Sequence, residues 1–158
     1  MRNAIRHGVR TLALGGWREL ADVAAAQRAL VAAQLLVWRR PVGQLLESMP
    51  KSAASDPHVP IHERIEAARI AVAQSRAARH GVFRPRCLVR ALALHRALEA
   101  RGIRGSIVRI GVRQQGADLL AHAWVEHRGV VLGDTTALTS AFSVLTDAHL
   151  ATAVAERA

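Results

Sequence analysis

The sequence of 158 residues predicts an α+β fold, in which a helical N-terminal region precedes a helix that packs on a small antiparallel sheet. Ala and Leu dominate the apolar residues while aromatic residues make up only 3%, a composition that favours helices over an all-β protein. Apolar residues recur at helical spacing before Gly81, whereas segments rich in Ile and Val follow Gly102. The length suits one compact domain, and we expect residues 1–80 to pack on a core formed by residues 81–158.

The first two predicted helices lie before Gly81. Strong helix formers fill residues 17–40 and stop at Pro41, which predicts one long helix. Residues 48–60 concentrate Ser, Pro and Asp and are expected to form a loop. A second helix is expected over residues 61–79, where apolar residues recur every three or four positions. These residues are Ile61, Ile65, Ala68 and Val72.

A third helix is predicted to begin at Cys87, the only cysteine of the chain. The preceding residues are Arg84-Pro85-Arg86, and proline is favoured in the first turn of a helix. Leu and Ala then recur at helical spacing up to Gly102, a residue type that is common just after a helix C-terminus. We therefore expect the thiol of Cys87 at or beside a helix N-terminus.

Three strands are predicted after this helix. They cover residues 103–112, 119–127 and 130–134, which are apolar, rich in Ile and Val, and partly alternating. The Ala-rich residues 137–158 are predicted to form a helical tail.

The loop between the last two predicted strands decides which residue faces His122. A three-residue loop, His127-Arg128-Gly129, would pair residue 126 with residue 130 and place Asp134 opposite His122. A two-residue loop would instead place Thr135 opposite His122 and turn Asp134 to the other face of the sheet. We favour the three-residue loop.

The chain carries a formal net charge of +10, and 22 of its residues are basic, all of them Arg except Lys51. Such a charge suits an acidic partner, such as nucleic acid, anionic lipid or an acidic peptide. The arginines are spread along the chain, as a high-GC genome produces, and aromatic platforms for stacking bases are nearly absent. No nucleic acid is therefore expected as a partner, while peripheral contact with a membrane stays open.

A cytoplasmic location is expected. A single cysteine cannot form an internal disulfide, so nothing implies an oxidising compartment. The N-terminal residues contain no apolar run typical of a signal peptide. The longest uncharged apolar stretch, residues 29–38, is shorter than the ~20 residues that cross a bilayer.

The stretch AHAWVE, residues 121–126, places a histidine within an apolar strand. Because strand side chains alternate, His122, Trp124 and Glu126 share one face. His122 is then either a core histidine bound to a backbone carbonyl or a catalytic base. Trp124 either belongs to the core or forms a wall of a substrate site, and Glu126 is expected at the rim.

Cys87, His122 and Asp134 together form the nucleophile, base and orienting acid that covalent acyl chemistry uses. The helix N-terminus and the neighbouring arginines favour the thiolate of Cys87, although a lone cysteine is also a common small core residue. Asp118, four residues before His122, is the competing orienting acid, and Asp134 is preferred.

In these residues the chain resembles the leader peptidases of lasso-peptide biosynthesis, whose core is papain- or transglutaminase-like. The resemblance extends from Phe83 to Asp134, about a third of the chain. It rests on CLVRALALHRALEARGI, on the strand ending IGV, and on AHAWVEHRGVVLGD.

The resemblance implies that Cys87 is the nucleophile, His122 the general base and later acid, and Asp134 the orienting carboxylate. Members of the family cut a precursor peptide made by the ribosome between its leader and its core. An ATP-dependent cyclase then closes a macrolactam ring on the exposed amino terminus. Some members carry a winged-helix domain for leader recognition, but residues 1–80 show no strand pattern here, so a separate leader-recognition protein is the expected partner.

Neither a metal nor a cofactor is expected. His58 and His62 have a spacing that can bind a metal on a helix, but Pro57 and Pro60 interrupt that helix and no third ligand is near. The backbone N–H of Cys87 is the expected oxyanion donor, and residues 79–86 contain no Asn or Gln that could supply a second.

Two other functions are compatible with the sequence. The first is an acyltransferase, in which an amine instead of water resolves the thioester. The second is a non-enzymatic, Arg-rich binding protein for nucleic acid or an anionic membrane.

Overall fold

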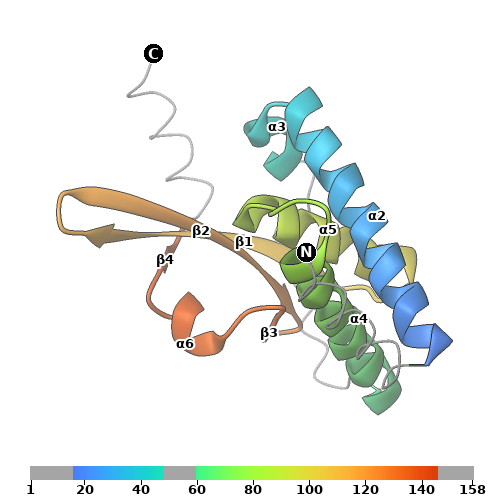
Figure 1. Cartoon of the computed structure of the whole chain (residues 1–158). Coiled ribbons are helices and arrows are strands. Elements are labelled where there is room, and N and C mark those ends of the chain that lie inside the picture. The colour runs from blue at the N-terminus through green and yellow to red at the C-terminus, as the bar shows by residue number, and fades with distance from the viewer. Residues whose placement is uncertain (1–15, 48–59, 146–158) are drawn as a thin grey trace.

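The computed structural model describes residues 16–47 and 60–145 of the chain. Within them a helical N-terminal region is followed by further helices and a four-stranded antiparallel sheet, so the predicted α+β class is confirmed. Figure 1 shows the long helices gathered on one side, with the long hairpin of the sheet extending away from them. Most of the loop expected at 48–60 and the end of the expected helical tail lie outside the described residues.

Three long helices form the helical side of the molecule. They are α2 (Trp17–Arg39), α4 (Ile61–His80) and α5 (Cys87–Ala100), and a short helix α3 (Val42–Glu47) follows α2. Pro41 ends α2 because its ring cannot continue the helix, and the chain turns into α3 after it. By length and composition α2 is also apolar enough to cross a membrane, and it is the one such helix in the described part of the chain.

Helix α5 is the centre of the molecule because two clusters of buried side chains meet on it. One cluster joins α5 to α2 and α4 through residues such as Leu30, Ala77 and Leu92. The other joins α5 to α4 and the sheet through residues such as Leu98, Ala123 and Val125. Small alanines let α2 and α4 approach α5 closely, so the first residue of α5 is held between the helices and the sheet.

The stripe of apolar residues that predicts α4 does not face this core. Ile61, Ile65 and Val72 are exposed, whereas the buried face of α4 is built mainly from Ala. The buried residues are Ala67, Ile70, Ala71, Ala73, Gln74 and Ala77. Close packing selects the small side chains for the inner face.

The sheet has the strand order β3-β2-β1-β4. Its strands are β1 (Ser106–Gln115), β2 (Asp118–His127), β3 (Val130–Leu132) and β4 (Ser143–Val144). Strands β1 and β2 pair along their whole length, from Ser106 with His127 to Gln115 with Asp118. Odd-numbered residues of β2, such as Ala123 and Val125, face α5, so the even-numbered residues lie on the opposite face.

The predicted register between β2 and β3 is wrong by one residue. Val125 pairs with Leu132 and His127 with Val130, so only Arg128 and Gly129 form the loop. Both have positive φ angles, 50° and 82°, as a type I′ turn requires. Arg128 adopts the left-handed conformation although it is not a glycine, because this turn matches the twist of the flanking strands.

The predicted helical tail is also wrong over its first part. A short helix α6 (Thr136–Thr139) is followed by β4, which pairs with Gly111 and Val112 of β1. Thr135 caps α6 by accepting a hydrogen bond from the N–H of Leu138. Hydrogen bonding to the edge of β1 thus outweighs the helix propensity of this part of the Ala-rich segment, which forms a strand instead.

Candidate functional site

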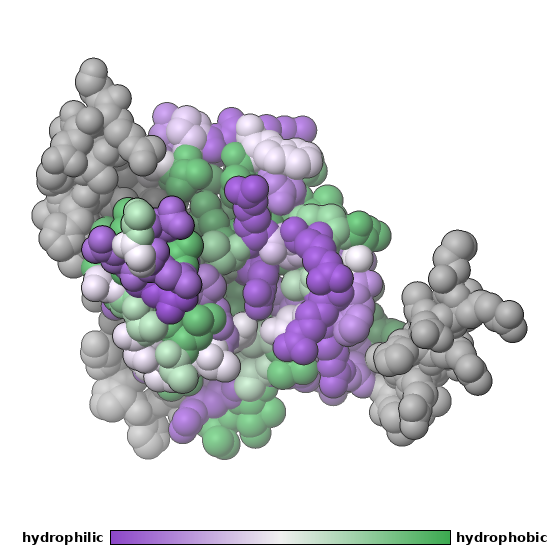
Figure 2. Space-filling view, turned by 60° about the vertical axis from the view of Figure 1, so that its left-hand side comes forward, coloured by the Kyte–Doolittle hydropathy of each residue, from purple (hydrophilic) through white to green (hydrophobic). Residues whose placement is uncertain are grey.

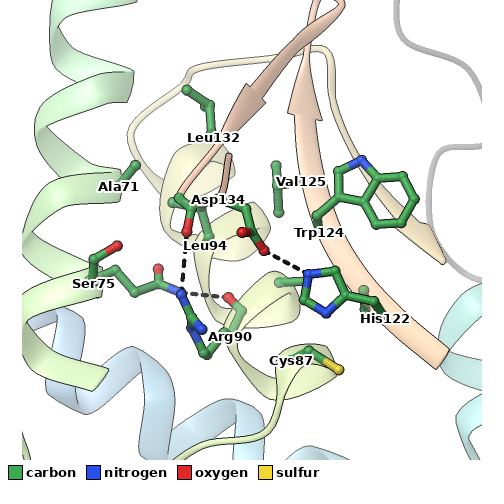
Figure 3. Close-up of a pocket in the computed structure, with 14 residues that line it drawn as sticks. Ala71, Ser75, Cys87, Arg90, Leu94, His122, Trp124, Val125, Leu132 and Asp134 are labelled. Atoms are coloured by element: carbon green, nitrogen blue, oxygen red, sulfur yellow. Dashed lines mark hydrogen bonds and ion pairs between the residues drawn. The ribbon is translucent and has the colours of Figure 1, made fainter. Parts of the chain in front are cut away.

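A pocket lies where α4, α5, β2 and the loop after β3 meet. Its lining includes Cys87 and Arg90 of α5, His122 and Trp124 of β2, and Asp134 of the loop. Figure 3 shows these side chains around the pocket. Figure 2 shows that this side of the molecule carries apolar residues set among hydrophilic ones. The three residues that the sequence singles out therefore line the same pocket.

His122 and Asp134 form a close pair in this pocket. The distance between His122 Nε2 and Asp134 Oδ2 is 2.7 Å, and each side chain is only 16% exposed. The other carboxylate oxygen, Oδ1, accepts a hydrogen bond of 3.0 Å from the backbone N–H of Thr135. Because both oxygens are engaged, the carboxylate is fixed in place and in turn fixes the orientation of the ring.

Asp134 contacts His122 from the loop after β3, and not from the strand position that the predicted register gives it. Strand β3 ends at Leu132, and Gly133 turns the chain with a φ of 73°. A Cβ on Gly133 would lie 3.1 Å from Leu94 Cδ2, and the carbonyl of Gly133 accepts a 3.3 Å hydrogen bond from Arg90. The alternation rule no longer applies to Asp134 because the residue lies beyond the strand.

Cys87 is the first residue of α5, and its free thiol is half-buried. The first N–H groups of a helix have no partner within it, and no side chain caps those of α5. Asp134 engages Nε2 of His122, and Figure 3 shows the other ring nitrogen, Nδ1, on the side facing Cys87. Among the described residues the thiol makes no hydrogen bond, to His122 or otherwise.

Two aromatic side chains hold the His122 ring. The Trp124 ring is stacked at a centroid distance of 6.1 Å, and the Phe142 ring is tilted at 5.3 Å. Trp124 is 3% exposed and donates its indole N–H to Glu126, which is also bound by Arg109. The three even-numbered side chains of β2 thus share one face, as alternation predicts.

Gly111 makes room for this arrangement. It is the partner of His122 on β1, and a Cβ there would lie 2.9 Å from the Trp124 ring and 2.8 Å from Phe142. Only a residue without a side chain lets these two rings cover the strand. Gly111 and Phe142 could not be recognised from the sequence, because their roles depend on the pairing of β1 with β4.

Two polar residues of the pocket were missed by the sequence reasoning. Arg90 lies one turn after Cys87, so its place beside the thiol could have been read from helical spacing. Gln74 comes from α4 and donates its amide to the carbonyl of Arg90 at 2.5 Å. No local signal connects Gln74 with the pocket, because it lies on another helix and outside residues 79–86.

The other candidates lie elsewhere. Asp118 is exposed and pairs with Gln115 at the tip of the β1–β2 hairpin, away from the pocket lining. His62 is exposed on α4, and His58 lies outside the described residues. Within residues 16–47 and 60–145, no cluster of His, Cys, Asp and Glu has the arrangement of a metal site.

Comparison with known families agrees with this architecture. A family model described as the transglutaminase-like superfamily matches residues 28–147, which covers the second half of α2, all of α4 and α5, and the whole sheet. No curated protein and no solved structure gives a match.

Proposed function

The chain belongs to the transglutaminase-like superfamily, which includes cysteine peptidases and acyltransferases, and on this premise we propose that it is a cysteine peptidase. One observation carries the proposal: a carboxylate-bound histidine shares a pocket with a cysteine that begins a helix. The proposed substrate is a lasso-peptide precursor made by the ribosome, cut between its leader and its core. The resemblance of residues 87–103 and 121–134 to lasso-peptide leader peptidases supports this choice.

In the first half of the reaction, Nδ1 of His122 accepts the proton of Cys87, and Sγ attacks the scissile carbonyl carbon. Asp134 stabilises the resulting imidazolium through Nε2–H and does not itself take the proton. The tetrahedral intermediate collapses by breaking the C–N bond. The departing amine takes the proton from Nδ1, which leaves the leader bound to Cys87 as a thioester.

In the second half, water attacks the thioester carbonyl while Nδ1 of His122 takes one of its protons. Breaking the C–S bond releases the leader with a new carboxylate, and the sulfur recovers the proton from His122. Hydrogen-bond donors must stabilise the negative charge that develops on the carbonyl oxygen in both halves. The backbone N–H of Cys87 is one such donor in this proposal, because no side chain caps the start of α5.

The proposal includes three features of the cellular context. A separate leader-recognition protein would present the precursor, an ATP-dependent macrolactam-forming cyclase would use the released core, and the reaction would take place in the cytoplasm. Trp124 is proposed to contribute to substrate binding through the wall that it forms beside His122.

Mixing the chain with the precursor and with the recognition protein encoded beside it tests this function, with fragment masses as the readout. We expect two fragments, with ¹⁸O in the new carboxyl group of the leader when the reaction runs in H₂¹⁸O. Cys87→Ala and His122→Ala should abolish cleavage. His62→Ala, an exposed histidine on α4, is the matched control and should retain it.

Two results would contradict the proposal. Cleavage that persists in Cys87→Ala would show that Cys87 is not the nucleophile. A leader joined to an amine, with no ¹⁸O incorporated, would assign the chain to the acyltransferases of the same superfamily.

A further inference from the structure

The outward face of α2 carries apolar side chains that no other element within the described residues covers. The helix packs on α4 and α5 through Ala26, Leu30 and Ala33, and the opposite face points to solvent. Large side chains on that face are exposed: Trp17 by 88%, Val31 by 39%, Leu35 by 39% and Trp38 by 74%. Their spacing of three and four residues from Val31 onward places them in one row. We call this row, with Arg28 and Arg39 within it, the outer face of α2.

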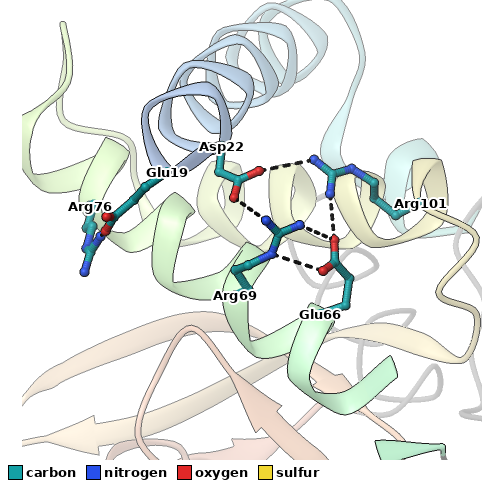
Figure 4. A network of polar contacts seen from close by, with 6 residues as sticks. All are labelled: Glu19, Asp22, Glu66, Arg69, Arg76 and Arg101. Atoms are coloured by element: carbon teal, nitrogen blue, oxygen red, sulfur yellow. Dashed lines mark hydrogen bonds and ion pairs between the residues drawn. The ribbon is translucent and has the colours of Figure 1, made fainter. Parts of the chain in front are cut away.

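Charge on the outer face and next to it has one sign. Arg18, Arg28, Arg39 and Arg40 form no ion pair with any residue that the structure describes. The two acids of α2 are engaged by other helices: Glu19 binds Arg76, and Asp22 binds Arg69 at 2.7 Å. Figure 4 shows these carboxylates among the arginines of α4 and α5. The outer face therefore combines aromatic and aliphatic side chains with uncompensated positive charge.

We propose that the outer face of α2 docks on an anionic membrane surface, with the helix lying in the plane of the headgroups. Trp17 and Trp38 stand about 30 Å apart along the helix, and Trp side chains favour the boundary between headgroups and acyl chains. The arginines can extend their charged ends to the phosphates while their stems lie against the apolar row. Each arginine near an anionic surface strengthens such attachment.

The arrangement argues against two other modes for α2. A second copy seated on the same face would bring Arg28 and Arg39 close to the same residues of its partner, and these like charges would repel. Insertion across the bilayer would pull Ala26, Leu30 and Ala33 out of the core and break the contacts of Asp22 with Arg69. Lying on the surface keeps the fold intact.

Docking through α2 is compatible with access to the pocket. The residues that line the pocket come from α4, α5, β2 and the loop after β3, and α2 contributes none of them. Attachment would thus hold the protein at the membrane with the pocket open. The inference does not depend on the proposed peptidase activity.

Flotation of the full chain with vesicles tests the inference. The vesicles contain phosphatidylcholine alone or with about 30% phosphatidylglycerol, an anionic lipid. We expect flotation with the anionic vesicles, a shift of the tryptophan emission to shorter wavelength, and weaker binding at high salt. Trp124 is already buried, so the emission shift would report Trp17 and Trp38. No flotation, or equal flotation with neutral vesicles, would overturn the inference.

A pair of double variants shows whether α2 is responsible. Arg28→Gln with Trp38→Ser should weaken binding to anionic vesicles about tenfold or more. Arg64→Gln with Ile65→Ser changes an exposed arginine and a 62% exposed apolar residue on α4, and should weaken it less than about twofold. Circular dichroism checks that both variants fold. Equal losses would overturn the assignment to α2, as would binding to poly-L-glutamate without binding to vesicles.

Discussion

His122 depends on three neighbours that act on different parts of its ring. Asp134 binds Nε2, while Trp124 and Phe142 contact the ring itself. The ring is thus held in one orientation, with Nδ1 on the side facing Cys87. Preorganisation of this kind avoids the cost of ordering the ring during the reaction.

Asp134→Asn tests the orienting carboxylate. An amide cannot stabilise the imidazolium by charge, so we expect cleavage of the precursor to slow by about 10²- to 10⁴-fold. Binding and the melting temperature should change little, because the shape of the side chain is kept. Asp118→Asn, at the exposed hairpin tip, is the matched control. Equal rates for the two variants would exclude a role for Asp134.

His95 is a second buried histidine, and it makes the stability of the fold depend on pH. Its Nδ1 lies 2.9 Å from Ser106 Oγ, and burial lowers the pKa of His95 below its usual value of 6.5. As the pH falls below 6.5, His95 binds a proton in the unfolded chain but not yet in the folded protein. The unfolding free energy therefore decreases through this range, until the pH reaches the lower pKa of the folded state.

The double variant His95→Leu with Ser106→Ala removes this buried pair without leaving one partner unsatisfied. We expect its unfolding free energy to decrease less than that of the wild type between about pH 7.5 and 5.5. Urea unfolding at the two pH values gives the comparison. The same decrease in both proteins would show that His95 is not the group that titrates.

At the scale of elements, the loop after β3 matters most because it delivers Asp134 to the site. Gly133 adopts a φ of 73°, a Cβ on it would lie 3.1 Å from Leu94, and Arg90 binds its carbonyl. Gly116 at the hairpin tip has a similar φ of 64°, but a Cβ there would meet nothing within 4 Å. The two glycines share the same backbone requirement and differ in their surroundings.

Gly133→Ala should displace Asp134 and slow cleavage by about tenfold or more, because small misplacements of catalytic groups are costly. Gly116→Ala should leave cleavage unchanged. Both variants should destabilise the fold, by about 1 kcal/mol for the positive φ alone. Melting temperatures report the backbone strain in both variants, and cleavage rates report the misplacement of Asp134. A fully active Gly133→Ala would contradict the importance of this loop.

The helices are joined by a network of ion pairs. Asp22 of α2 binds Arg69 of α4 and Arg101, the residue that follows α5, and both arginines bind Glu66. Arg69 lowers the pKa of Glu66. Figure 4 shows that the network connects all three helices. The Asp22 side chain is only 15% exposed, so its partners are less screened by water than a surface pair.

Asp22→Ala should lower the unfolding free energy by about 1–2 kcal/mol, because it leaves Arg69 without one of its carboxylates. Glu99→Ala removes a longer, exposed pair with Arg104 and should cost less than about 0.5 kcal/mol. Urea unfolding near neutral pH compares them. Similar losses would show that the network contributes no more than a surface ion pair.

For the whole molecule, the sequence predicts the order of elements well because each long element has a local signal. Pro41 marks the end of α2, Pro85 the start of α5, and period-two alternation the shared face of His122 and Trp124. That Cys87 and His122 line one pocket does not follow from these signals alone, because alternation places His122 on the face of β2 opposite to the one that packs on α5.

Other features depend on contacts between distant segments, and local patterns could not reveal them. The type I′ turn needs a positive φ at Arg128, β4 forms because β1 has a free edge, and Gln74 enters the pocket from α4. Asp134 contacts His122 although the predicted register is wrong, because the chain leaves the strand at Gly133. The inner face of α4 is chosen by packing, which favours Ala over the Ile and Val of the outer stripe.

The most direct test of the central claim is the rate at which iodoacetamide alkylates Cys87 near neutral pH, in the wild type and in His122→Ala. Because the chain has a single cysteine, one adduct in the intact mass reports this thiol alone and no substrate is needed. If His122 takes the proton of Cys87, the wild type should react about tenfold faster or more than the variant. Equal rates in two folded proteins would contradict the proposed pairing of thiol and imidazole.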